Sequence, residues 1–140
     1  MISSIVDRLM EANTPFRLCG GAGALASVKD RPLQVPAVYV FEATETSAIS
    51  ERATGPVLQR STVDIGVVIV TENLSGTDEF AAAEDIGNLK SYVRSKLIGF
   101  MAAGADEPLQ HVTGELQQAV AGTIWFEDVY TTARYIQEQL

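Results

Sequence analysis

The most suggestive chemical motif in the sequence is a run of small residues at positions 21–26, GAGALA, which fits the pattern G-x-G-x-x-A. In dinucleotide-binding proteins this pattern follows a strand and opens a helix whose N-terminus meets the pyrophosphate, and an acid about 20 residues further on binds the ribose. A short predicted strand at 16–18 precedes the run, and Glu42 lies near the expected position of that acid. However, the segment between Gly23 and the prolines has room for only about five helical residues, and a crossover between parallel strands needs at least ~10. A glycine-rich turn is the preferred interpretation, and a small nucleotide-binding domain that uses Gly21, Ala22 and Gly23 is the weakest alternative.

The residue types that act as nucleophiles, bases or metal ligands are few and scattered. His111 is the only histidine, and it is predicted to lie in a surface loop after Pro108 without a catalytic partner. Cys19 is the only cysteine, so no internal disulfide can form, which suits a reducing compartment, and a zinc cluster is excluded. A small buried thiol is the expected state of Cys19. We therefore predict no catalytic residue, no cofactor-binding residue and no metal site.

Acidic residues occur as three adjacent pairs, which would be candidates for acid–base catalysis if their carboxylates shared one face. Neighbouring residues point to different faces of a helix and to opposite faces of a strand, so adjacency alone does not make such a pair. The expected state of all three pairs is that of ordinary solvated acids. They are Glu84-Asp85, Asp106-Glu107 and Glu127-Asp128.

The bulk composition fits a single domain spanning 1–140 with enough apolar residues, 46%, to build a core. The formal net charge of −8 argues against a general binder of nucleic-acid backbones, which needs a basic surface. A local basic patch is conceivable, but acids are mixed through the same regions, so a solvated face is preferred. Its members would be Arg52, Arg60, Lys90, Arg94 and Lys96.

Neither a membrane span nor a secretion signal is expected. No apolar run approaches the roughly 18 residues that a membrane helix requires. Asp7 and Arg8 interrupt the N-terminal segment, which also lacks a basic start.

The first half of the chain predicts a helix, a short strand and two longer strands. Apolar residues at helical spacing indicate an amphipathic helix over 2–13, which Pro15 ends, and a brief helix is expected over 24–28. Residues 37–43 alternate, with Val38 and Val40 on one face and Ala37, Tyr39 and Phe41 on the other. Residues 57–72 predict a long strand. The polar stretch from Thr44 to Pro56 between these strands predicts a long loop that projects from the body.

The second half predicts one long helix and two final strands. A helical stripe of apolar residues covers 79–100, and Gly104 is a plausible stop. Residues 112–121 and 123–136 indicate two strands around Gly122. The last strand carries aromatic and apolar residues on both faces, so it is expected to have a partner on each side, and its aromatic residues Trp125, Tyr130 and Tyr135 belong either to the core or to an interface.

These elements predict an α+β fold: an antiparallel or mixed β-sheet of about four to five strands, with an N-terminal helix and one long helix packed on one face.

In this order, the segments resemble the phage tail terminator and minor tail protein family. The resemblance is carried by the N-terminal helix, the Phe16-Arg17-Leu18 to Gly-Gly segment, residues 33–40 (LQVPAVYV), and Gln59-Arg60 leading into the strand 64–70. It continues through residues 97–100 (LIGF), 108–112 (PLQHV) and 122–128 (GTIWFED). The chain departs from the family pattern at Phe100, where tryptophan is usual, and in the loop 102–106.

The resemblance implies a non-enzymatic subunit without cofactors that forms a ring, usually a hexamer, on the end of the tail tube. Its implied partners are further copies of itself, the tail tube protein and the head-completion proteins, with no direct contact to nucleic acid or membrane. Its implied place is the virion tail, after synthesis in the host cytoplasm. Another head–tail joining or tube-like subunit of similar fold is the main alternative.

A closed ring needs a heterologous interface, for which the best candidates are the loop 44–55, the edges of strands 37–43 and 57–72, and the two-faced last strand. The predicted interface residues are Glu45, Ile49, Arg52, Val57, Gln59, Arg60, Trp125 and Tyr130.

Overall fold

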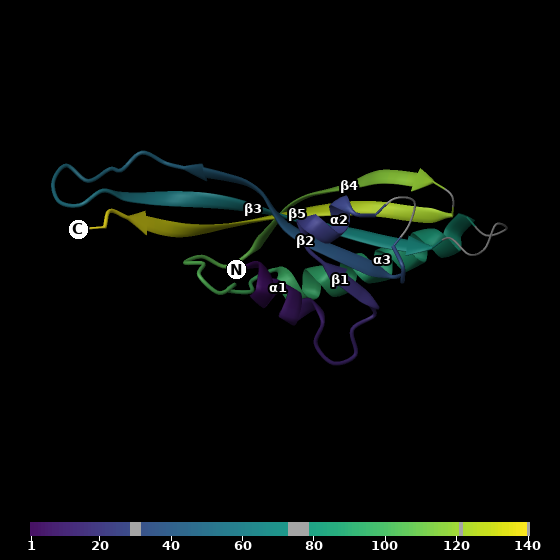
Figure 1. Ribbon diagram of the computed structural model, residues 1–140. Helices are drawn as coiled ribbons and strands as arrows, with labels where there is room; N and C mark the ends of the chain where they lie inside the picture. The colour runs from purple at the N-terminus through teal and green to yellow at the C-terminus, as the bar shows by residue number, and fades with distance from the viewer. Residues whose placement is uncertain (29–31, 73–78, 121, 140) are drawn as a thin grey trace.

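The computed structural model describes residues 1–28, 32–72, 79–120 and 122–139, with the backbone alone at 79–84 and 120 (Figure 1). Three helices and five strands follow one another in these ranges. They are α1 (Ile2–Leu9), β1 (Leu18–Gly20), α2 (Ala22–Ala26), β2 (Ala37–Ser47), β3 (Leu58–Glu72), α3 (Glu79–Leu97), β4 (Gln110–Val120) and β5 (Thr123–Gln137). No helix in the described ranges is long and apolar enough to cross a membrane.

The strands form one mixed sheet in the order β1-β2-β3-β5-β4. β1 pairs with β2 in parallel, and the other three pairs are antiparallel. This confirms the predicted α+β class and the predicted mixed sheet with an N-terminal helix and a long helix packed on it.

Alternating residues divide the sheet into two faces, as the period of two predicts. Val38 and Val40 face the main core, which α1 and α3 cover, whereas Ala37 and Tyr39 face a smaller second core. The short helix α2 contributes Leu25 to that second core. The prediction of helices on one face is therefore right for α1 and α3, while α2 lies on the other face.

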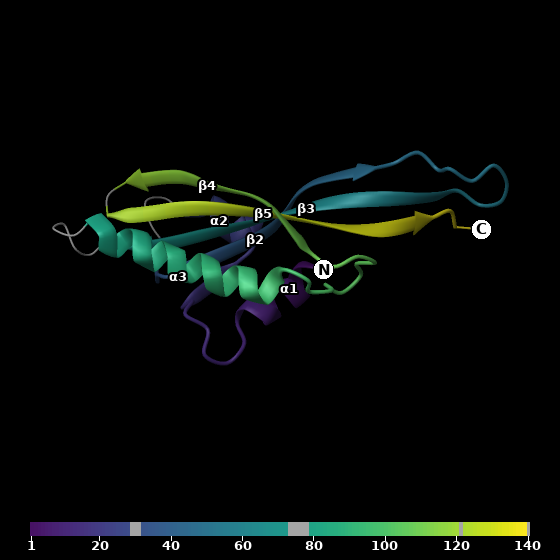
Figure 2. The same ribbon diagram turned by 180° about the vertical axis from the view of Figure 1, so that it is seen from behind.

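β2 is longer than predicted, and this changes the shape of the molecule. The strand continues to Ser47, where Ser47 pairs with Ser61 of β3, so the predicted projecting loop shrinks to residues 48–57. A register shift between Glu42 and Thr44 marks a bulge, which bends a strand and increases its twist. Beyond this point the three strands β2, β3 and β5 leave the body together (Figures 1 and 2). We call this extension, residues 44–62 and 132–138, the arm.

Both long helical predictions end too late. α1 stops at Leu9 rather than residue 13, and Asn13 then adopts a left-handed conformation with φ of 71°. α3 stops at Leu97 rather than residue 100, because Gly99, with φ of 84°, turns the chain and donates its N–H to the Leu109 carbonyl at 2.8 Å. Gly104 lies in the loop beyond and does not terminate the helix.

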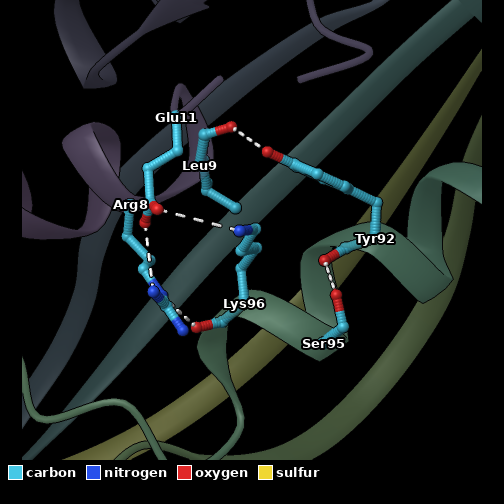
Figure 3. Close-up of polar contacts among 6 residues, drawn as sticks. All are labelled: Arg8, Leu9, Glu11, Tyr92, Ser95 and Lys96. Atoms are coloured by element: carbon cyan, nitrogen blue, oxygen red, sulfur yellow. Dashed lines mark hydrogen bonds and ion pairs between the residues drawn. The ribbon is translucent and has the colours of Figure 1, made fainter. Parts of the chain in front are cut away.

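Polar contacts hold the end of α1 against α3 (Figure 3). The Tyr92 hydroxyl donates to the Leu9 carbonyl at 2.8 Å, and the Arg8 Nε donates to the Lys96 carbonyl at 3.1 Å. The terminal carbonyls of a helix lack partners within it, so these contacts satisfy one such group on each helix. They explain why α1 ends where it does.

We expect Tyr92→Phe to lower the free energy of unfolding by about 0.5–1.5 kcal/mol, the usual net value of one hydrogen bond, because the Leu9 carbonyl loses its donor. Urea unfolding measures the change. The matched control is Ser95→Ala, because Ser95 is exposed and bonds only locally to the Tyr92 carbonyl. If both variants lost the same stability, the contact between α1 and α3 would not matter.

Candidate assembly surfaces

The structure brings six of the predicted interface residues together on the arm. Glu45 lies on β2, Ile49, Arg52 and Val57 lie in the 48–57 segment, and Gln59 and Arg60 lie at the start of β3. Ile49, Arg52 and Arg60 line one hollow of about 390 Å³, together with Ala48, Glu51, Leu58 and Tyr135.

The charged members of this set form ion pairs that orient the arm. Glu45 accepts hydrogen bonds from Arg134 and Ser61, each at 2.8 Å, and these bonds lower the pKa of Glu45. Arg60 holds both carboxylate oxygens of Glu107, at 2.6 and 2.8 Å, which lowers the pKa of Glu107 and ties the arm to the loop before β4. These pairs are half-exposed, so we assign them to orientation of the arm more than to stability.

The apolar members are left uncovered. Ile49 is 89% exposed and Val57 44%. Tyr135 and Ile136, which follow on β5, are 50% and 42% exposed. The sequence analysis named Tyr135 and missed Ile136. The signal for Ile136 was that the predicted strand continues beyond the last residues that the core can cover. The arm therefore presents apolar side chains on a framework of ion pairs.

Three of the predicted interface elements lie within the fold of the single chain. Tyr130 is fully buried in the main core, and Trp125 is buried in the second core with its Nε1 bonded to Thr123 at 3.1 Å. Neither side chain is available to another subunit in this conformation, because each one fills its own face of the sheet. The strand 57–72 also offers no edge, because β3 pairs with β2 on one side and with β5 on the other.

A buried polar network, which the sequence analysis did not predict, joins β4, β5 and α3. Asp128 is fully buried and accepts hydrogen bonds from Arg94 at 2.9 and 3.1 Å and from Tyr130 at 3.0 Å. His111 Nε2 lies 3.2 Å from the same carboxylate. Asp128 is thus not a solvated acid, and His111 lies on β4 rather than in a surface loop.

The network keeps Asp128 ionised. Burial alone would raise the pKa of Asp128, but the hydrogen bonds from Arg94, His111 and Tyr130 outweigh it and lower that pKa. The opposite position on β4 is Gly114, where a Cβ would lie 2.7 Å from Asp128 Oδ1. A side chain at Gly114 would therefore push the strands or the carboxylate apart.

The network resembles a catalytic constellation but has no nucleophile beside it. Cys19, whose pKa burial raises to about 11, lies on β1, at the opposite edge of the sheet from β4. The Tyr130 hydroxyl already donates to Asp128 and its pKa is raised, by burial first and then by the charge of Asp128. Among the residues that the structure describes, no group of three or more His, Cys, Asp or Glu side chains could hold a metal ion. The arrangement joins β4, β5 and α3.

The glycine just before the motif has a packing role, whereas a Cβ at Gly21 or Gly23 would meet no tight contact. α2 is only five residues long, as the sequence analysis expected of this region. Gly20 lets this helix approach β1, since a Cβ there would lie 2.7 Å from the Cβ of Ala24. Beside it lies a hollow of about 510 Å³, which the described residues line mainly with apolar side chains such as Leu18, Val28 and Pro32.

The basic residues considered for a nucleic-acid patch are engaged within the chain. Lys90 lies 4.3 Å from the centre of the Phe126 ring, Lys96 lies 3.8 Å from Glu11, and Arg94 and Arg60 hold Asp128 and Glu107. The Arg52 Nη1 donates to the Pro56 carbonyl at 3.3 Å. Three of the five residues thus have an acidic partner, whereas Lys90 and Arg52 contact uncharged groups.

The chain is a small α+β protein that extends three of its strands into an arm with exposed apolar side chains. The family model for the phage tail terminator protein matches residues 1–139. The chain belongs to the phage tail terminator family and is a structural protein of the phage tail. The sequence-based resemblance is thereby confirmed.

A solved structure agrees with this fold. A chain titled "Virion of native gene transfer agent (GTA) particle" is similar with a TM-score of 0.59 and 14% identity, over 99% of this chain and 95% of that chain. At this identity the likeness shows the shared fold. The comparison with curated proteins gave no match.

We expect Arg94→Met to lower the free energy of unfolding by about 1.5–3 kcal/mol at neutral pH, because the buried Asp128 loses its charged donor. The control Lys90→Met, on the same helix, removes only a cation–π contact worth at most about 1 kcal/mol. The pKa of Asp128 is depressed from 3.8, so the contribution is present above that pH and is lost as pH falls through the folded pKa. Equal penalties for the two variants, or an Arg94→Met penalty that persists in acid, would contradict the network.

Glu115 and Glu127 face each other across β4 and β5. The pKa of Glu127 is raised, mainly by burial and to a smaller extent by repulsion from Glu115. We expect Glu127→Gln to raise the melting temperature at neutral pH. The gain should shrink as the pH falls through the raised folded pKa and vanish below 4.5, where Glu127 is protonated in both states. Glu115→Gln should give a smaller gain, because it removes only the smaller cause. A destabilised Glu127→Gln variant at neutral pH would show that the pair has a favourable role.

Proposed function

We propose that this protein is a tail terminator in the full sense: copies of it close into a ring that caps the tail tube and joins it to the head-completion proteins. The family assignment supports the tail terminator class. The observation that carries the ring is the arm, because its tip lies away from the body of the subunit (Figure 1) and its residues Ile49 and Val57 are exposed. Apolar side chains held on an extension suit a contact with a neighbouring copy.

The arm is a suitable ring contact because it is already ordered in the single chain. Its strands are paired to the end, with Leu58 opposite Gln137, and the Glu138 N–H donates to the Val57 carbonyl at 2.8 Å. Less conformational entropy is then lost on assembly than if the arm folded on contact. Residues 48–57 at the tip form no strand and are the segment we expect to adjust on the tube end.

The proposed partners are further copies of the chain, which form a hexamer, the tail tube protein and the head-completion proteins. We infer a place in the virion tail, after synthesis in the host cytoplasm. We also infer no enzymatic role, no cofactor and no direct recognition of nucleic acid. In support, Asp128 is engaged by Arg94, His111 and Tyr130, and Arg60 and Arg94 are paired with Glu107 and Asp128.

Electron microscopy of tail tube protein polymerising with this chain tests the proposal directly. A terminator predicts a ring at tube ends and a narrow length limit. Tubes of unlimited length with bare ends would exclude capping, and binding at an end without a length limit would favour a head–tail joining or tube-like subunit instead.

We expect Ile49→Asp to abolish ring formation on tube ends while leaving the free energy of unfolding within about 0.5 kcal/mol, as for other exposed surface positions. Electron microscopy and urea unfolding measure the two effects. The matched control is Leu33→Asp, since Leu33 is 98% exposed but lies outside the arm. Rings of normal appearance from the Ile49→Asp variant would show that the arm tip is not the contact.

A further inference from the structure

The sheet has an unprotected edge at β4. This strand pairs with β5 on one side, and residues 112–119 are exposed along their whole length. Natural edge strands are usually shielded by lysine, proline or short length, because a bare edge pairs with other chains. β4 is eleven residues long and contains neither lysine nor proline, and its shielding is limited to the bulges between His111 and Thr113 and between Leu116 and Gln118. Val112 and Leu116 add apolar groups that are 51% and 56% exposed.

A second unprotected edge runs along β2. β1 pairs only with Ala37 to Tyr39. Among the residues that the structure describes, no strand pairs with the outer side of β2 beyond Tyr39. The free stretch, Val40–Ser47, therefore runs from the body into the arm (Figure 2).

The comparable edge of β5 in the arm is capped. The Asp106 N–H donates to the Ala133 carbonyl at 2.9 Å, and the Asp106 carboxylate accepts the Tyr135 N–H at 2.8 Å. The Thr132 hydroxyl also donates to the Glu107 carbonyl at 2.6 Å. The chain thus covers one edge with its own loop and leaves two others open.

The two open edges complement each other in direction. Successive strands from β2 through β3 and β5 to β4 alternate, since each pair is antiparallel. β2 therefore runs opposite to β4, and placing β2 of a second copy beside β4 continues the same alternation. The two edges lie on opposite sides of the sheet, so the contact is heterologous and can repeat around a closed ring.

We propose that β4 of one copy pairs antiparallel with the Val40–Ser47 stretch of the next copy, so that the sheets of neighbouring subunits become continuous. The occupant is a second copy because one chain supplies both complementary edges. This inference rests on the proposed ring and specifies how its subunits join. The arm of each copy then lies along the body of its neighbour.

Site-specific crosslinking with a short bismaleimide tests the pairing. Cys19→Ala provides a cysteine-free background, into which Thr46→Cys on β2 and Gln117→Cys on β4 are introduced in separate full-length chains. Both positions are exposed. Ser3→Cys, exposed on α1, is the matched control. Tube capping by each chain is recorded in parallel by electron microscopy.

We expect covalent dimers when the Thr46→Cys and Gln117→Cys chains are mixed, and none above background from either chain alone or from Ser3→Cys with either. Dimers from Gln117→Cys alone would indicate symmetric β4 pairing and overturn the proposal. Rings on tube ends without mixed crosslinks would also overturn it while leaving the proposed function intact. Mixed crosslinks without capping would support the pairing and contradict the terminator role. If neither crosslinks nor capping were seen, the pairing and the terminator role would both be overturned.

Discussion

The pairing of β3 with β5 is the constraint on which the rest of the molecule depends. Both strands are fifteen residues long, and their register is unbroken from Glu72 opposite Thr123 to Leu58 opposite Gln137. One half of this ribbon lies between the two cores and contributes Ile65, Ile69 and Tyr130 to the main one. The other half continues outward as the arm. The assembly surface is therefore an extension of the same hydrogen-bonded ladder that the core stabilises.

The remaining polar interactions attach other segments to this ribbon. Asp128 on β5 contacts Arg94 of α3 and His111 of β4, and the lack of a side chain at Gly114 leaves space for the Asp128 carboxylate. Asp106 and Glu107, in the loop before β4, bond to β5 and to Arg60 of β3. These contacts set the position of β4 and cap one edge of the arm. The buried acid thus holds α3 and β4 against β5.

The features that follow from local periodicity were predictable from the sequence. Alternation placed Val38 and Val40 on one face and Ala37 and Tyr39 on the other, and helical spacing located α1 and α3. The features that depend on distant residues were not. The ends of α1 and α3 depend on Tyr92 and Gly99, and the state of Asp128 depends on Arg94, thirty-four residues away in the chain. Tyr130 was assigned to an interface from the pattern of the last strand, which has apolar residues on both faces. Such a pattern is the same whether each face packs on a core of the same chain or on a partner subunit. The arm residues named from the sequence, Glu45 to Arg60, stay a prediction for the interface.

The central claim is that the arm is a preformed continuation of the core sheet, ready to contact another subunit. Amide hydrogen exchange of the free full-length chain tests this most directly. The claim predicts that the amides of Ser61 to Val63 and Thr132 to Arg134, in the arm ladder, exchange nearly as slowly as those of Val67 to Val70 in the core. Exchange of the arm amides at the rate of an unfolded peptide, while the core stays protected, would contradict it.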